Sequence, residues 1–333
     1  MRIIVTGGAG FIGSNLILFL HEQVDDIEIL NIDKLTYASD VGALAPLRNS
    51  KGYHFSKIDL VDREEVRNVI MKWKPHGVLH LAAESHVDNS IKGPEPFVLS
   101  NVLGTFNLLE ECRQYWMGSN EGLTKHRFLH VSTDEVYGTL GDDGFFNERT
   151  PYAPNSPYSA TKAGSDMLVR SYHHTYGMNV VISNCSNNFG PHQHNEKLIP
   201  TVIRHALHHK KIPVYGDGSN VRDWLYVRDH CSALIKIFME GKTGEQYVVG
   251  GDNEWKNIDL VHAICEILNE EVSNGPDGDY KNLISFVTDR PGHDYRYAID
   301  SSKLKEELQW QPSVDFRKNL RSTILWYVDK YIS

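Results

Sequence analysis

The sequence contains few cysteines, and none of them is spaced for a metal site or a disulfide framework. Its 333 residues include four, with no C-x-x-C pair: Cys112, Cys185, Cys231 and Cys265. Thiols this far apart are typical of buried cysteines in a reducing compartment. A small secreted domain held together by disulfides is therefore excluded.

Long apolar runs and an excess of basic residues are also missing. No segment has the length and apolarity of a membrane span, and Met1 leads directly into a strand pattern rather than a signal peptide. The formal net charge of -9 argues against a nucleic-acid surface, which needs clustered Lys and Arg. We expect a cytoplasmic protein that binds neither membrane nor nucleic acid. The net charge does not exclude a small phosphorylated ligand, which needs only a local basic pocket.

Histidines are abundant, but their spacing does not indicate a metal site. The sequence has 17 of them, and pairs such as His173-His174 and His208-His209 have no partners at ligand spacing. We interpret them as solvent-facing helix residues and expect no metal cofactor.

Strand and helix patterns alternate through the first half of the chain. The hydrophobic content of 41% and charged content of 23% are typical of a soluble globular protein. This rhythm predicts β-α-β units and a doubly wound parallel sheet of the Rossmann type. The predicted strands are 2–6, 28–33, 53–57, 77–82, 127–132 and 179–183, and the helices are 11–23, 64–72, 94–115 and 157–176.

The second half is less regular and predicts a smaller, interleaved α/β domain for the substrate. Its predicted elements are the helices 198–210, 229–239, 258–269 and 316–331 and the strand 246–249, with a polar surface loop at 273–279. We assign 1–185 plus about 224–252 to a dinucleotide-binding domain, and 186–223 plus about 253–333 to the substrate domain.

A glycine-rich turn joins the first predicted strand to the first helix. Gly7, Gly10 and Gly13 permit a tight turn, bring backbone N–H groups against a pyrophosphate and let the helix pack on the strand. Asp33 ends the second strand, where a carboxylate accepts both ribose hydroxyls and repels a 2′-phosphate. This favours NAD over NADP as the dinucleotide. We prefer this role of Asp33 to the alternative in which it only caps the end of the strand. Asp59 is a candidate for the adenine amino group, with a plain loop role as the alternative.

Tyr158 and Lys162 lie four residues apart, on one face of the predicted helix 157–176. A phenol has a reference pKa of about 10, so it needs a nearby cation to act as a base near neutrality. Lys162 can supply that charge and also hold the nicotinamide ribose. The spacing alone is common, but its place after a glycine-rich turn predicts a pair that deprotonates an alcohol while a hydride leaves its carbon.

Asp134 and Glu135 follow Thr133 at the end of a predicted buried strand. An isolated Asp-Glu pair would more often cap a helix and face solvent. Beside the Tyr-Lys pair, two like charges in one pocket separate in pKa and produce one acid and one base. We therefore predict a reaction that continues beyond oxidation.

Taken together, these motifs resemble one enzyme family. Beside the glycine-rich turn they comprise 33–37 (DKLTY), 81–88 (LAAESHVD), 132–138 (STDEVYG), 157–162 (PYSATK), 186–188, 196–200, 221–225 and 289–294. Nearly end to end, the chain is similar to the nucleotide-sugar 4,6-dehydratases of the extended short-chain dehydrogenase/reductase group. The resemblance implies bound NAD and a dTDP-glucose substrate, with UDP-glucose as the alternative.

The resemblance also implies which residues contact each ligand. For NAD they are Gly7, Gly10, Phe11, Ile12, Gly13, Asp33, Lys34, Leu35, Thr36, Asp59, Leu60, Leu81, Ala82, Ala83, Ser100, Tyr158, Lys162 and Asn188. For the nucleotide sugar they are Ser85, Thr133, Asn187, Lys197, Leu198, Pro213, Tyr215, Arg222, Asn257, Asp289, Arg290 and His293. Arg222 suits a diphosphate, because a guanidinium donates two parallel hydrogen bonds. Without the motif, a surface ion pair with Asp223 would be the interpretation.

Three places depart from the usual family sequence. Asn89 stands where Arg is more common, Phe189 replaces a common Tyr, and 193–195 (Gln-His-Asn) stands where an aromatic residue and a proline are usual. None of these removes a predicted catalytic group, but they bear on the nucleotide preference.

The hypothesis that follows assigns a role to each catalytic residue. Thr133 binds the sugar 4-hydroxyl, Tyr158 deprotonates it with Lys162 as its cation, and Glu135 and Asp134 eliminate water across C5 and C6. The alternatives are a nucleotide-sugar 4-epimerase, which needs no acid and base at C5 and C6, and a non-catalytic redox-sensing or scaffolding protein. As in the family, helices 94–115 and 157–176 are expected to form a homodimer seam.

Overall fold

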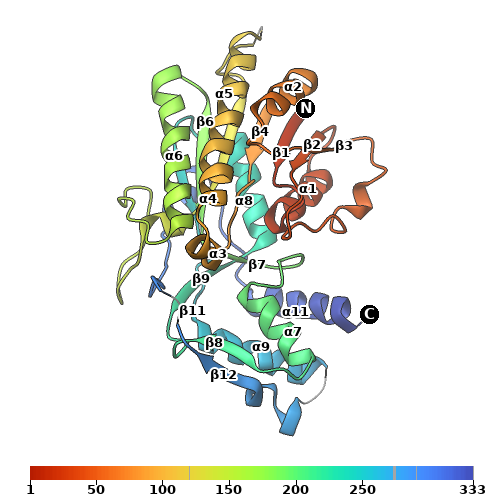
Figure 1. The fold of residues 1–333 in the computed structure, drawn as a ribbon, viewed down its shortest axis with the longest axis vertical. Coiled ribbons are helices and arrows are strands. Elements are labelled where there is room, and N and C mark those ends of the chain that lie inside the picture. Colours follow the sequence, from red (N-terminus) through yellow and green to blue (C-terminus); the bar gives the residue numbers. More distant parts are fainter. Residues whose placement is uncertain (120, 273–274, 290, 333) are drawn as a thin grey trace.

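The molecule has a large lobe built on a parallel sheet and a smaller lobe below it (Figure 1). This computed structural model describes residues 1–119, 121–272, 275–289 and 291–332. Within them the large sheet has seven strands, all parallel, in the order β10-β6-β5-β4-β1-β2-β3. The strands are β1 Arg2–Thr6, β2 Glu28–Asp33, β3 Tyr53–Lys57, β4 Gly77–His80, β5 Arg127–Thr133, β6 Val180–Cys185 and β10 Gln246–Val249. The predicted doubly wound Rossmann class is confirmed.

Helices cover both faces of this sheet, which is why its central strands are almost entirely buried. In β1, Ile4 pairs with Leu30 of β2 on one side and with Val78 of β4 on the other. The helices α1 (Phe11–Gln23) and α8 (Val227–Glu240) pack on one face. On the other face lie α2 (Arg63–Trp73), α5 (Gly104–Met117) and α6 (Pro157–Tyr176).

Local sequence sets the start and the end of α6. Ser156 accepts a hydrogen bond from the N–H of Ser159, and the hydroxyl of Ser159 accepts one from the N–H of Ser156, which forms a capping box. Pro157 occupies the first turn, where its missing N–H costs no hydrogen bond. Gly177 ends the helix in the left-handed region. These signals place Tyr158 in the first turn, at the edge of the sheet.

The predicted helix 94–115 is helical but not uniform. It comprises α4 (Glu95–Phe97), the π-helical stretch η2 (Val98–Leu103) and α5, which ends two residues later than expected at Met117. Other predicted elements agree within a few residues, and the short helix α3 (Val87–Lys92) was not predicted.

The smaller lobe contains two short sheets and several helices. Its sheets have the orders β11-β9-β7 and β12-β8, and α7, α9 and α11 pack around a second hydrophobic core. The elements are β7 Asn187–Phe189, α7 Leu198–Leu207, β8 Ile212–Tyr215, β9 Val221–Tyr226, β11 Glu254–Lys256, α9 Asn257–Glu271, β12 Ile284–Val287 and α11 Phe316–Ile332. The helix α10 (Ser302–Leu308) lies between β12 and α11 in the sequence, but its Leu304 and Leu308 pack in the core of the large lobe. The separate core supports the predicted division into two domains, whose boundaries stay a proposal.

Short 3-10 turns complete the described chain, at Ala45–Leu47 (η1), Asp134–Tyr137 (η3), Pro276–Gly278 (η4) and Tyr280–Leu283 (η5). Of the predicted loop 273–279, the first two residues lie outside the described part. Among the described helices, none is long and apolar enough to cross a membrane.

Candidate active site

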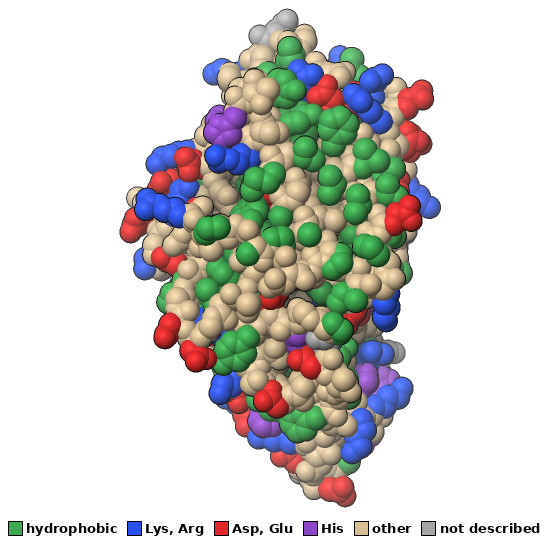
Figure 2. Space-filling model, turned by 60° about the vertical axis from the view of Figure 1, so that its left-hand side comes forward, with side chains coloured by type: hydrophobic (Ala, Val, Ile, Leu, Met, Phe, Trp, Pro, Cys, Tyr) green, Lys and Arg blue, Asp and Glu red, His purple; other side chains and the backbone are tan. Residues whose placement is uncertain are grey.

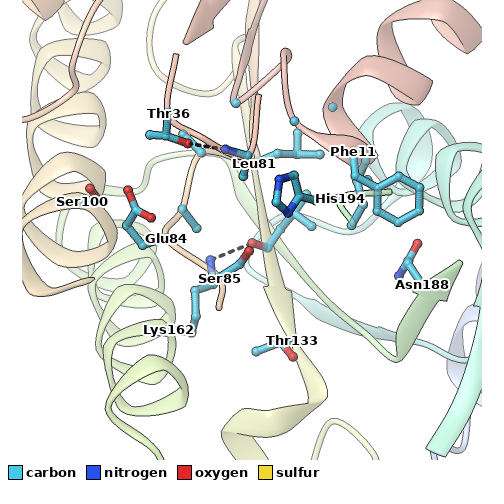
Figure 3. Close-up of a pocket in the computed structure, with 18 of the residues that line it drawn as sticks. Phe11, Thr36, Leu81, Glu84, Ser85, Ser100, Thr133, Lys162, Asn188 and His194 are labelled. Carbon is cyan, nitrogen blue, oxygen red and sulfur yellow. Dashed lines mark hydrogen bonds between the residues drawn. The ribbon is translucent and has the colours of Figure 1, made fainter. Parts of the chain in front are cut away.

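One cavity of about 310 Å³ opens at the carboxyl ends of the central strands. Figure 3 shows Thr133 from the end of β5, Lys162 from α6 and Asn188 from β7 around the same space. Active groups of doubly wound sheets belong at this edge, because the strand order reverses there and leaves a crevice.

The glycine-rich turn forms one wall of the cavity in the way its sequence predicts. Gly7 has a φ of +70°, and a Cβ on it would lie 2.7 Å from the backbone nitrogen of Ala82. A Cβ on Gly13 would overlap the carbonyl oxygen of Gly7. Gly10 caps α1 without a side chain, so no side-chain acceptor stands between the first N–H groups and a pyrophosphate. This cradle fits a dinucleotide.

Asp33 lines the cavity at the end of β2. Its carboxylate accepts hydrogen bonds from the N–H of Ala9 at 3.0 Å and of Leu35 at 2.8 Å. Its orientation is therefore fixed by the backbone. Next to it, the ammonium of Lys34 lies 3.0 Å from the carboxylate of Glu84 and donates to Ser100 at 2.7 Å.

The cavity brings together most of the residues predicted for the dinucleotide. All of them line it except Leu35, whose backbone N–H holds Asp33 instead. Of the residues predicted for the sugar nucleotide, only some line it: Ser85, Thr133, Asn187 and Lys197. Leu198 and Asn257 begin helices in the smaller lobe, Pro213 and Tyr215 lie on β8, and Arg290 lies outside the described residues.

Three of the remaining sugar-nucleotide residues gather in the smaller lobe. His293 lies 2.6 Å from the carboxylate of Asp289 and faces the ring of Tyr215 edge-on. That these three residues bind the nucleotide end of the substrate stays a prediction.

Arg222 lies on β9 outside the cavity lining, with 5% of its surface exposed. Its guanidinium donates to the carbonyls of Val221 and Asp294 and stacks on the ring of Tyr297, 4.2 Å from the ring centre. Asp223 is buried and accepts hydrogen bonds from two backbone N–H groups, so the alternative of a surface ion pair is wrong. The contact of Arg222 with a diphosphate stays a prediction.

Several lining residues were not predicted, among them Glu84, Cys185, His194 and Glu196. Glu84 was identifiable in principle, because it lies in the segment after β4, at the same edge of the sheet as Thr133 at the end of β5. Cys185 ends β6, and its apolar strand pattern indicated only a buried thiol. His194 stands in the segment that departs from the family sequence, and only the fold brings it to the cavity.

The five predicted catalytic residues line this one cavity. Asp134 is only 2% exposed, accepts a hydrogen bond from the hydroxyl of Thr133, and has a second oxygen without a hydrogen-bond partner among the described residues. Burial, and then the nearby Glu135 and Asp223, raise the pKa of Asp134 well above its usual range. A raised pKa favours the protonated form of Asp134, which is the form that a general acid needs.

The Tyr158–Lys162 pair is buried as well. Burial and the charge of Glu135 raise the pKa of Tyr158, the opposite of the direction expected from Lys162. The ammonium of Lys162 donates to the carbonyl oxygen of Val131 at 2.9 Å, and burial lowers its pKa. The folded surroundings therefore disfavour the phenolate form of Tyr158, and further positive charge nearby would favour it.

A buried polar network lies behind these residues. Asp166, one helical turn after Lys162, accepts hydrogen bonds from Tyr152 at 2.8 Å and from Asn184 at 3.1 Å, and lies 3.1 Å from His130. Asn184 also donates to the carbonyl oxygen of Thr133 at 3.1 Å. Burial lowers the pKa of His130 to about 4, so this imidazole is neutral. The network therefore connects α6 to the end of β5.

These contacts stabilise the charged form of Asp166. Burial raises its pKa, but the close contact with His130 and the positive charge of Lys162 outweigh burial and lower it. In return, Asp166 opposes the lowering of the pKa of Lys162. Each of the two groups therefore favours the charged form of the other.

Comparison with known proteins identifies the family. The family model described as GDP-mannose 4,6 dehydratase matches residues 4–323. The chain belongs to this dehydratase family. It is 52% identical to a probable dTDP-glucose 4,6-dehydratase of Sinorhizobium fredii, over 99% of this chain and 93% of that protein. The resemblance seen in the sequence motifs is confirmed.

Solved structures of relatives share the whole fold. The dTDP-glucose 4,6-dehydratase of Bacillus anthracis, crystallised with NAD, is 42% identical with a TM-score of 0.88, covering 99% of this chain and 97% of that one. The Streptomyces venezuelae enzyme, crystallised with NAD and dTDP, is 40% identical with a TM-score of 0.89 and the same coverage.

Asp166→Asn should move the alkaline limb of the pH profile of turnover to lower pH, by about one unit or more. The amide removes the charge that raises the pKa of Lys162, so Lys162 loses its proton at lower pH. The substitution leaves the other titratable groups around Lys162 unchanged. They are His80, His130, Tyr158 and Cys185.

The matched control is Glu111→Gln. Glu111 is a buried carboxylate that pairs with Arg63 and Arg67 and does not line the cavity. This variant should lose stability without any change in the pH profile. Equal displacement of the alkaline limb in both variants would contradict the role of Asp166.

Proposed function

We propose that this protein is a dTDP-glucose 4,6-dehydratase that uses NAD. The observation that carries the proposal is a second acid-base pair, Asp134 and Glu135, in the cavity of Tyr158 and Lys162. Simple alcohol oxidation needs only the phenol and the ammonium. The similarity to dTDP-glucose 4,6-dehydratases supports the same reaction: the Bacillus anthracis structure contains NAD, and the Streptomyces venezuelae structure contains NAD and dTDP.

The residues around the glycine-rich turn would hold NAD. The turn and the N-terminus of α1 suit its pyrophosphate, and the carboxylate of Asp33 suits a ribose that carries no 2′-phosphate. When bound, NAD supplies a positively charged ring that accepts a hydride from C4 of the sugar and later returns it to C6.

In the first step, the hydroxyl of Thr133 positions the sugar 4-hydroxyl and Tyr158 removes its proton as C4 is oxidised to a ketone. Tyr158 must ionise for this, so its raised pKa has to fall when the ligands are in place. Lys162, at the next turn of α6, stabilises the phenolate by its charge.

In the second step, the ketone acidifies the hydrogen on C5. Glu135 removes that proton while Asp134 gives its own proton to the C6 hydroxyl, so the C6–O bond breaks and water leaves. The hydride then adds to C6, and C5 regains the proton that Glu135 holds. The product is a 4-keto-6-deoxy sugar, and the net change is the loss of one water.

Incubation with dTDP-glucose tests this function directly. A 4-keto product absorbs in alkali, and its formation without added NAD would support a dehydratase that retains its cofactor. Formation of a galactose nucleotide would instead favour the epimerase alternative. Rates measured side by side on dTDP-glucose and UDP-glucose decide the nucleotide, and we expect the faster rate with dTDP-glucose.

Glu135→Gln and Asp134→Asn should each permit C4 oxidation but slow elimination, because each removes one of the two proton transfers of the second step. General acid-base groups contribute about 10²- to 10⁴-fold, so turnover should fall by that range. Enzyme-bound reduced dinucleotide should accumulate above the wild-type level, visible in its near-ultraviolet absorbance. Equal loss of oxidation and elimination in both variants would contradict these roles.

We also infer a homodimer formed through α5 and α6. Figure 2 brings forward the side of the molecule where these helices lie and shows hydrophobic side chains spread over it. Large apolar side chains exposed on these helices and on the adjoining η2 are Val98, Leu99, Leu103, Met117 and Met167. An apolar face of this kind suits a second copy of the chain.

Leu99→Glu combined with Met167→Glu should yield a monomer in analytical ultracentrifugation, because the seam would then bury unpaired charges. Met239→Glu, an equally exposed methionine on α8, should leave the assembly unchanged. A dimer that persists in the double variant would contradict this seam.

We place the enzyme in the cytoplasm, with a nucleotide sugar rather than a nucleic acid as its partner. The four cysteines are free and buried, which suits a reducing compartment. The acidic net charge of -9 disfavours phosphate-backbone binding.

A further inference from the structure

The segment 191–196, called the cover here, connects β7 to α7 without forming a helix or strand. Its residues Gln193, His194 and Glu196 line the cavity beside the predicted dinucleotide residues. In Figure 3, His194 lies at the same cavity as Phe11, Leu81 and Ser85. The cover includes 193–195, one of the three places that depart from the usual family sequence, and the proposed chemistry gives these residues no role.

The last helix of the chain, α11, holds the cover from behind. The fully buried Tyr327 donates a hydrogen bond to the carbonyl oxygen of Gln193 at 2.6 Å. One turn later, Tyr331 donates to the side chain of Asn195. The ring of Trp326 lies 4.6 Å from that of His192. Three aromatic residues of α11 therefore contact three successive parts of the cover.

A second set of contacts ties the cover to the loop after β2. The imidazole of His192 and the ammonium of Lys330 lie 3.3 Å and 3.5 Å from the same carboxylate oxygen of Asp40. The backbone N–H of Asp40 donates to the carbonyl of Ala9 in the glycine-rich turn at 2.7 Å. Asp40 thus joins the cover, α11 and the wall of the dinucleotide cavity.

We infer that α11 fastens the cover over the dinucleotide, with Tyr327 and Asp40 as positioning residues that set how slowly NAD leaves. This inference rests on the proposed function, since a cofactor that ends each cycle as it began has no need to dissociate. A loop without secondary structure opens easily, and its opening rate depends on the few contacts that hold it.

Release of NAD from the purified holoenzyme tests the inference without any sugar substrate. An excess of an NAD-consuming enzyme captures the released cofactor, and the time course reports the dissociation rate. Tyr327→Phe removes only the hydroxyl and should speed release about two- to tenfold, the effect of one typical hydrogen bond. Asp40→Asn should also speed release, through the separate contacts with His192 and Lys330.

The matched control is Tyr247→Phe. Tyr247 is also fully buried, but its hydroxyl bonds Lys242 and Glu307, away from the cavity. NAD should leave the Tyr247→Phe variant at the same rate as it leaves the wild type. Excess NAD should restore full turnover in the Tyr327 and Asp40 variants.

Two outcomes separate this inference from the proposed function. Unchanged release in both positioning variants, or equal acceleration in the control, would overturn the role of α11 while wild-type turnover of dTDP-glucose stays intact. A wild-type protein that retains no NAD and forms no 4-keto product would instead overturn the proposed function.

Discussion

Desolvation at the carboxyl edge of the parallel sheet is the constraint on which this site depends. Helices cover both faces of the sheet, so polar groups at the strand ends lie in a largely apolar surrounding. Burial raises the pKa of Asp134 and Tyr158 and lowers that of Lys162. One physical cause thus favours the protonated form of Asp134 and disfavours the charged form of Lys162.

Such a site is stable only if its buried charges are compensated. Asp166 receives hydrogen bonds from residues on different elements, and Asn184 links it to the carbonyl of Thr133. A buried carboxylate without these donors would take up a proton or destabilise the fold. The contacts that favour the charged form of Asp166 therefore also join α6 to β6 and, through Asn184, to the end of β5.

The smaller lobe completes the cavity from outside the sheet. Lys197 at the start of α7 donates to the carbonyl of Ser85, which connects the two lobes across the cavity. The end of the chain takes part as well, because α11 contacts the segment beside this junction. A site formed by elements so far apart in sequence requires the whole chain to fold first.

Local patterns alone determined the Rossmann half, the glycine-rich turn and the Tyr158–Lys162 pair, because apolar periodicity and helical spacing are properties of neighbouring residues. They did not reveal β7, β8, β9, β11 and β12, since such short strands depend on distant partners. Only the tertiary structure buried Arg222, brought His194 to the cavity and placed Asp166 against His130. The tertiary structure also decided the direction in which the pKa of Tyr158 is shifted. Burial and the charge of Glu135 come from the folded surroundings rather than from spacing along one helix.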